Sequence, residues 1–412
     1  MYNTKSKPDI DPGKIVIFGA GKIGRSFLGQ LFGCAGYRVV FVDVDSVLVE
    51  RLNERGSYPV IIKGETEQEI IVPNVSAILA FDKDKVTEAV ASAGILSVNV
   101  GKNALGKVIP IIAEGLKIRY IQHPNAPLDI ILAENMRDAA QFVREQLMLS
   151  LPENYPIEKL VGLVETSIGK MVPIMPLAEM EKDPLMVFAE PYNSLILDQK
   201  GFRSNIPVVK GLSPKSNIKA WVDRKAFIHN LGHATAAYFG YFLHPELIYM
   251  YEVLDDPEVL RFTREVMLQS AAVLLKCYPD DFTLNDLVVH TDDLIRRFRN
   301  KALKDTVYRV GQDLTRKLGE GDRFMGVIRL AIGKKLPYDL ILRVLTYGFF
   351  FQATNEEGQM TESDMTFLKK LSVDFEDAIT NFLLLDPNSD AQLILELAEF
   401  HSQLKMIHKH HG

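Results

Sequence analysis

A glycine-rich turn near the N-terminus constrains the fold most strongly. Residues 14–18 read KIVIF, residues 19–24 read GAGKIG, and residues 25–35 follow with a helical pattern. A second apolar run, RVVFVDV at 38–44, completes a strand–helix–strand unit of about thirty residues. A glycine turn without a ligand is the alternative, but strand, turn and helix agree in order and length. The chain is therefore expected to begin with a Rossmann-type dinucleotide-binding domain.

The three glycines of this turn have different expected tasks. Gly19 allows the tight turn, Gly21 lets the backbone approach a pyrophosphate, and Gly24 lets the helix pack closely. The helix N-terminus then offers N–H groups and a positive dipole end to the anion. The predicted cofactor-binding residues of the turn are Gly19, Ala20, Gly21, Lys22, Ile23 and Gly24.

An acidic residue at the end of the second strand indicates which dinucleotide binds. Asp43 follows Gly24 by about 20 residues, where a carboxylate can accept hydrogen bonds from both ribose hydroxyls. The same charge would repel a 2′-phosphate, and Asp45 adds a second negative charge nearby. The predicted cofactor is NAD rather than NADP.

Later strand ends also carry polar residues. Residues 57–63 and 68–73 predict an antiparallel hairpin, after which a strand over 95–100 leads into Gly101 and Asn103. Ligands of open α/β sheets bind at the carboxyl ends of the strands, so both residues are expected to contact the cofactor. Asn135, after a strand over 129–133, points its amide into the cleft or caps the next helix.

The second half of the 412-residue chain has a helical period. The predicted fold class is α/β plus all-α: a Rossmann domain over 1–205 and a mostly helical substrate domain over 206–412, with a cleft between them for a small substrate. The predicted helices are 218–242, 256–277, 284–297, 302–317, 322–333, 337–352, 362–385 and 390–408.

The predicted helix over 218–242 carries the candidate catalytic residues. On an ideal α-helix, Asn230 and His233 lie at about 140° and 80° from Lys225, so the three share one broad face. A lysine whose pKa is lowered by burial can remove an alcohol proton as general base. An amide can stabilise the developing oxyanion, and a histidine can orient hydroxyl groups. By itself, however, this pattern of three residues also arises by chance.

A metal site is the competing interpretation of the same helix. His229 and His233 have the spacing of two ligands on one helix face, but the glutamate of a zinc-hydrolase helix is absent between them. The two cysteines, Cys34 and Cys277, cannot form a cysteine-rich zinc site. We expect no metal, with His229 a packing or surface residue.

Composition excludes several other classes. The net charge of −6 makes nonspecific nucleic-acid binding a poor prediction. No apolar run reaches the roughly 18 residues of a membrane span, and the N-terminus lacks the apolar region of a signal peptide. The expected compartment is the cytoplasm, with no membrane or nucleic-acid partner.

Several segments taken together resemble the long-chain, metal-independent polyol (mannitol) dehydrogenase family. They are FGAGKIGR, VVFVDVD, NERGSYPV, ENM at 134–136, DRKAFIHNLGHATAAYFGY, and residues 297–331. The resemblance covers nearly the whole chain and implies a Rossmann domain followed by a helical substrate domain. It implies that Lys225 is the catalytic base, Asn230 and His233 its polar partners, and Asn135 a second oxyanion-holding amide.

Departures from the family pattern concern the substrate. Lys170 stands where the family usually has arginine, and Lys301 and Leu314 replace prolines. The expected reaction interconverts mannitol 1-phosphate and fructose 6-phosphate; an unphosphorylated polyol, a hexuronate or a silent NAD sensor are the alternatives. The protein is expected to be a monomer or small homo-oligomer. The candidate phosphate anchors, which could equally be solvated helix faces, are Arg309, Arg316, Lys317, Arg323 and Arg329.

Overall fold

The computed structural model describes residues 9–134, 136–173 and 175–411. The chain divides between Val222 and Asp223 into two compact units. This division falls later than the boundary expected at residues 205 and 206. The reason is that β11 (Leu212–Lys215) pairs in parallel with β10 (Leu195–Asp198), so this segment extends the sheet of the first unit.

The first unit contains a doubly wound sheet. Within the described residues this sheet has eight strands in the order β11-β10-β8-β7-β6-β1-β2-β5. The strands from β8 to β5 are parallel, whereas β10 is antiparallel to β8. With β1 between β6 and β2, the order is that of a Rossmann domain. The strands not yet located are β1 (Asp11–Phe18), β2 (Arg38–Asp43), β5 (Val75–Leu79), β6 (Ala93–Val98), β7 (Leu128–Leu132) and β8 (Val161–Ser167).

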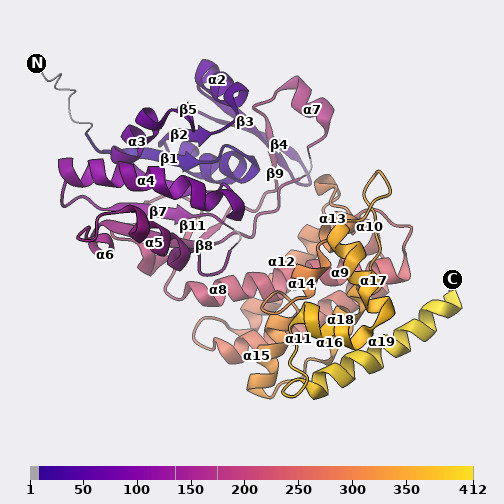
Figure 1. The fold of residues 1–412 in the computed structure, drawn as a ribbon. Coiled ribbons are helices and arrows are strands. Elements are labelled where there is room, and N and C mark those ends of the chain that lie inside the picture. Colours follow the sequence, from indigo (N-terminus) through magenta and orange to yellow (C-terminus); the bar gives the residue numbers. More distant parts are fainter. Residues whose placement is uncertain (1–8, 135, 174, 412) are drawn as a thin grey trace, which may run out of the picture. The chain divides into compact units, whose positions relative to one another are not determined.

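Both faces of this sheet are covered, because alternate side chains of β1 enter two separate cores. Val16 and Phe18 pack with α3, α4 and α5, which lie along the sheet in Figure 1. Ile15 and Ile17 face the core that also contains side chains of η1, α1 and α2. The helices are α3 (Lys83–Ala91), α4 (Lys102–Gln122), α5 (Ala139–Ser150), the π-helix η1 (Gly24–Gly29), α1 (Gln30–Cys34) and α2 (Ser46–Arg55).

A small sheet packs on the second of these cores. The predicted hairpin is confirmed, since β3 (Tyr58–Lys63) pairs antiparallel with β4 (Glu67–Val72). β9 (Val187–Ala189) adds to β3 in parallel, whereas β10 belongs to the large sheet. Short helices complete the unit at α6 (Ile157–Leu160), α7 (Leu177–Lys182) and η2 (Gln199–Gly201).

The second unit is helical, as the period of the sequence predicted. In the described part of the chain, no helix is both long and apolar enough to span a membrane. The unit begins within α8 (Ile218–Arg224), whose residues up to Val222 belong to the first unit, and continues with η3 (Lys225–Asn230) and α9 (Leu231–Leu243). The others are α10 (Met250–Val253), α11 (Pro257–Cys277), α12 (Leu284–Phe298), η4 (Lys301–Leu303), α13 (Val307–Gly311), α14 (Leu314–Leu318), α15 (Met325–Lys334), α16 (Asp339–Gly348), α17 (Glu362–Val373), α18 (Phe375–Leu383) and α19 (Ala391–His411).

Helix α9 forms the centre of this unit, and its residues from Leu231 to Gly240 are buried except His233. A Cβ at Gly232 would lie 2.4 Å from Sδ of Met267 on α11, so a larger residue would force the Met267 side chain to move. Gly232, within the motif around Lys225, therefore allows α9 and α11 to pack closely.

A single helix over 302–317 is a wrong prediction. The segment forms η4, α13 and α14, separated by Lys304 and Asp313, both of which adopt positive φ angles. Thr306 caps α13 by accepting from the backbone N–H of Arg309. The breaks place Asp305 and Arg309 beside the helix that carries the candidate catalytic residues.

Candidate functional site

The glycine turn of the first unit has the geometry of a dinucleotide site. Gly19 adopts a φ of 95°, and a Cβ on Gly24 would lie 2.0 Å from the carbonyl oxygen of Gly19. A Cβ on Gly21, in contrast, would meet no atom within 4 Å. The first and third glycines are therefore needed for the close turn, and the second faces open space where a ligand can approach.

Asp43 is fixed at the end of β2. Its Oδ2 accepts from the backbone N–H of Ala20 at 2.6 Å, and its Oδ1 accepts from that of Asp45 at 3.0 Å. Each oxygen keeps a further lone pair for a ribose hydroxyl. Asp45 itself caps α2 by accepting from the N–H groups of Val47 and Leu48. Asp45 is thus held at the N-terminus of α2, whereas the carboxylate of Asp43 contacts the glycine turn.

A cavity of about 660 Å³ lies against this turn. Gly19, Gly21 and Asp43 line one part of it, and Val44 and Phe81, both largely exposed, line another. Such apolar walls beside a carboxylate suit a flat base joined to a ribose. Gly101 and Asn103 lie at the start of α4, beyond the end of β6, where the sequence placed them; Lys22 is exposed at the start of the turn.

Two residues of this site were missed. Asn99 donates through Nδ2 to the Gly19 carbonyl at 2.8 Å, and its Oδ1 is buried with no hydrogen-bond partner among the residues that the structure describes. Buried Arg25 donates through Nε to the Ala20 carbonyl at 2.7 Å. Both brace the turn. Asn99 also lines the cavity described above.

In the second unit, Lys225 and Asn230 are the first and last residues of the π-helix η3. The N–H of Leu231 donates to the carbonyl of Ala226, five residues earlier. Residues five apart therefore take the stacked relation that residues four apart have in an α-helix. Lys225 and Asn230 lie closer in angle than an ideal α-helix predicts, and π-turns of this kind occur frequently at functional sites.

Lys225 has the protonation behaviour of a base. It is partly buried, and its pKa is lowered to about 8, chiefly by loss of hydration. The positive charge of Arg323 contributes to this lowering, and the negative charge of Asp322 opposes it. A substantial fraction of Lys225 is therefore neutral near physiological pH and can accept a proton.

His233 lies one turn beyond η3, in contact with a carboxylate. Its Nε2 is 3.3 Å from Oδ2 of Asp305, a close contact that falls short of a well-directed hydrogen bond. Burial lowers the pKa of His233 and outweighs the opposing effect of Asp305, so the ring is neutral at pH 7. Asp305 was missed, because the helix predicted over 302–317 hid the break that places it here.

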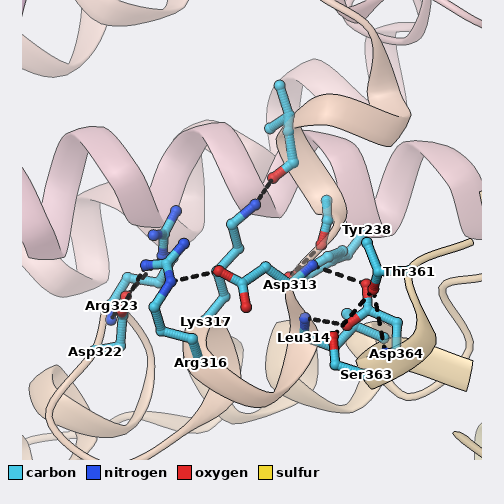
Figure 2. A network of polar contacts seen from close by, with 12 residues as sticks. Tyr238, Asp313, Leu314, Arg316, Lys317, Asp322, Arg323, Thr361, Ser363 and Asp364 are labelled. Carbon is cyan, nitrogen blue, oxygen red and sulfur yellow. Dashed lines mark hydrogen bonds and ion pairs between the residues drawn. The ribbon is translucent and has the colours of Figure 1, made fainter. Parts of the chain in front are cut away.

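Basic residues of α14 and of the segment after it lie beside the helix formed by η3 and α9 (Figure 2). Lys317 is 7% exposed, donates to the Val310 carbonyl at 2.6 Å, and has its pKa lowered to about 7, chiefly by burial and then by Arg323. Arg323 donates to the carbonyl of Asn230 at 3.3 Å. Arg323 therefore contacts the last residue of η3, and its charge affects Lys225.

The other site residues have different positions. Asn135 lies outside the described residues. Lys170 belongs to the first unit, where it donates to Asn193 Oδ1 at 2.8 Å and to Gln30 Oε1 at 3.2 Å. His229 is buried against Phe298, with ring centroids 5.5 Å apart. Among the residues that the structure describes, no group of three His, Cys, Asp or Glu side chains could hold a metal ion.

The two units correspond to two domains of one known family. Residues 13–211 match the mannitol dehydrogenase Rossmann domain, and residues 217–385 match the mannitol dehydrogenase C-terminal domain. The chain belongs to the mannitol dehydrogenase family. This membership confirms the predicted resemblance, the predicted fold class and NAD as the cofactor, and it makes the chain an oxidoreductase of the polyol dehydrogenase type.

Solved structures agree with this fold. The chain is similar to mannitol 2-dehydrogenase of Pseudomonas fluorescens, solved with NAD and D-mannitol, at 15% identity and a TM-score of 0.74 over 98% of this chain and 96% of that one. It is also similar to a substrate-free D-sorbitol dehydrogenase, at 17% identity and a TM-score of 0.76 over 97% of this chain and 95% of that one. At these identities the likeness shows the shared fold.

Proposed function

We propose that this member of the family interconverts mannitol 1-phosphate and fructose 6-phosphate, with Lys225 as general base. The observation that carries the assignment is the π-turn, which brings Asn230 toward a partly buried lysine whose pKa is about 8. A lysine with this pKa is matched to proton transfer near neutral pH.

Each polar side chain has a distinct proposed task. Lys225 takes the hydroxyl proton of the alcohol, while the amide of Asn230 donates to the oxygen as it becomes a carbonyl. His233 orients a neighbouring hydroxyl, and Asn135 remains the proposed second amide. NAD, when bound to the first unit, accepts the hydride from the alcohol carbon. The proposed cofactor contacts are Gly19, Ala20, Gly21, Lys22, Ile23, Gly24, Asp43, Gly101 and Asn103.

The phosphate preference is supported by the cations between Arg309 and Arg323. Lys317 and Arg323 are 7% and 8% exposed, and Arg309 lies one turn after Asp305 on α13. A phosphate could recruit these donors and would hold Lys317 in its charged form.

A neutral polyol such as mannitol is the second candidate substrate. It is favoured because the candidate phosphate-binding arginines are already paired with carboxylates. Arg309 pairs with Asp305, Arg316 with Asp313, and Arg323 with Asp322. Arg329 pairs with Asp390, and Lys317 bonds a backbone carbonyl. A phosphate would have to compete with these partners, whereas a hydroxyl would not. The two similar solved enzymes are named for mannitol and sorbitol.

A parallel assay of NADH oxidation separates these substrates. Fructose 6-phosphate, fructose, fructuronate and tagaturonate are each supplied to the purified protein, and absorbance at the NADH band is followed. We expect fructose 6-phosphate to give the highest kcat/KM. A higher value with fructose would transfer the assignment to the neutral polyol, and turnover of none of the four would contradict the proposed activity.

A further inference from the structure

The ring of His233 is held on its face and on its edge. Phe298, at the end of α12, stacks on it with centroids 4.4 Å apart and planes inclined by only 4°. The Nε2 edge then meets the carboxylate of Asp305. Stacking fixes the plane of the ring, and the contact with Asp305 fixes its edge. What remains to be determined is which ring nitrogen carries the proton.

Asp305 is itself unusually well fixed. Its two oxygens accept from Nε and Nη2 of Arg309, each at 2.5 Å, in the two-pronged geometry of a strong arginine–carboxylate pair. Its backbone carbonyl accepts from the N–H of Met250 at 2.9 Å, and the next residue, Thr306, forms a bridge with Tyr249. Asp305 is only 4% exposed, so its carboxylate cannot turn toward solvent.

The charge of this carboxylate is maintained. Burial alone would raise the pKa of Asp305, but its contacts with His233 and Arg309 outweigh burial and lower the pKa to about 2. An ionised carboxylate can only accept hydrogen bonds. A neutral His233 beside it is therefore most stable with the proton on Nε2, which leaves the lone pair on Nδ1.

We propose that Asp305 is a positioning residue that fixes His233 as the Nε2–H tautomer and sets the orientation of the Arg309 guanidinium. The substrate would then meet a ring nitrogen that only accepts and a cation that only donates, both in one arrangement. Asp305 does not have to touch the substrate itself. The inference rests on the proposed function, because it assigns substrate contacts to His233 and Arg309.

Asp305→Asn tests this role with little change of shape. We expect the KM for the ketose substrate to rise about tenfold or more, the size of one lost hydrogen bond, while the Kd for NADH stays within about twofold. The matched control is Asp292→Asn, which removes an equally two-pronged pair with Arg264 on the surface of α11 and α12. Unchanged KM in a folded Asp305→Asn variant would overturn the proposal.

A double-mutant cycle separates positioning from general stability. If Asp305 acts in part through the ring, the loss in the double variant His233→Asn, Asp305→Asn should be smaller than the product of the two single losses. If Asp305 only supports the fold, the two losses should multiply and the melting temperature should fall with them. Multiplied losses would therefore overturn the proposal.

The tautomer can also be measured directly in the wild-type protein. In ¹⁵N-histidine spectra, assigned by comparison with His233→Asn, we expect the chemical shifts of an Nε2–H ring for His233. An Nδ1–H ring would overturn the inference even if Asp305→Asn failed to fold. This measurement does not depend on turnover, so it separates failure of the inference from failure of the proposed activity.

Discussion

Nη1 of Arg323 lies 3.3 Å from the backbone carbonyl oxygen of Asn230 and donates to it. The same guanidinium adds to the lowering of the Lys225 pKa, while Asp322, which accepts from Nε of Arg323 at 2.8 Å, opposes it. One arginine therefore holds the end of the π-turn and favours the neutral lysine at its beginning.

The pH dependence of turnover should report this lysine. Because Lys225 must be neutral to accept a proton, kcat/KM for polyol oxidation should rise through a pKa of about 8. Reduction needs the protonated lysine, so its kcat/KM should fall through the same range. Arg323→Gln should move both transitions to higher pH. Identical profiles for the variant and the wild type would contradict the electrostatic role of Arg323.

Replacing the base should abolish chemistry and spare the cofactor. We expect Lys225→Ala to lower kcat at pH 7 by about 10²–10⁴-fold, the range for loss of a general base. NADH binding, followed by its fluorescence, should remain nearly intact because the glycine turn belongs to the other unit. Turnover that persists in Lys225→Ala would show that another group removes the proton.

The same lysine should be unfavourable for stability. Its folded pKa of about 8 lies below the usual value near 10.4, so between these pH values the unfolded chain binds more protons. Lys225→Met should melt at higher temperature than the wild type below pH 8, and this advantage should shrink to zero near pH 10.4. Melting curves at pH 7, 9 and 10.5 check the trend; a constant difference would point to packing rather than charge.

Asp43 should set the choice of dinucleotide. With NADP bound, the Asp43 carboxylate would lose a hydrogen bond to the ribose and would repel the 2′-phosphate. NAD should therefore be preferred over NADP by at least about tenfold in kcat/KM. Asp43→Ala should narrow the preference and also weaken NAD binding, since Oδ2 accepts from Ala20. Equal use of both cofactors by the wild type would refute the assignment.

One departure from the family pattern has a structural role. The N–H groups of Asp313 and Leu314 donate to buried Asp364 at 2.8 and 2.7 Å, which caps α14 (Figure 2). Leu314→Pro removes one donor and follows a residue with positive φ, so it should cost about 1–3 kcal/mol of unfolding free energy. Lys301 is the other position where the family has proline. The residue before it, Asn300, is already in the extended conformation that precedes a proline, so Lys301→Pro should change the unfolding free energy by less than about 0.5 kcal/mol. Chemical denaturation of both variants tests the contrast.

The first two strands of the sheet were predictable because local signals mark them. Apolar runs, a glycine turn and an acid at a fixed distance specify β1, β2 and the turn between them. Helix α4 was missed, since its sequence is apolar around Pro110 and starts from Gly101 without a side-chain cap. The break of 302–317 was missed because positive φ at Lys304 and Asp313 is imposed by contacts from distant segments, among them Asp364.

The residues of the candidate site also fall into those that the sequence revealed and those that it did not. Lys225, Asn230 and His233 were visible as a spacing within one helix, and the family motif identified them. Asp305 and Asn99 were not visible, because each acts through a partner far away in sequence: Asp305 through His233, and Asn99 through Gly19. Such supporting residues carry no local pattern, and only the folded chain reveals them.

The π-turn also limits how this site can be transplanted. The wide turn of η3 brings Lys225 and Asn230 closer in angle than a regular α-helix would. A designer who copied the two residues onto a regular helix would place them about 140° apart, on diverging directions. Deleting one residue between them would restore regular α-helical winding and remove the wide turn that brings the two residues together. An active-site search template for such enzymes should therefore encode the backbone ring together with the side chains.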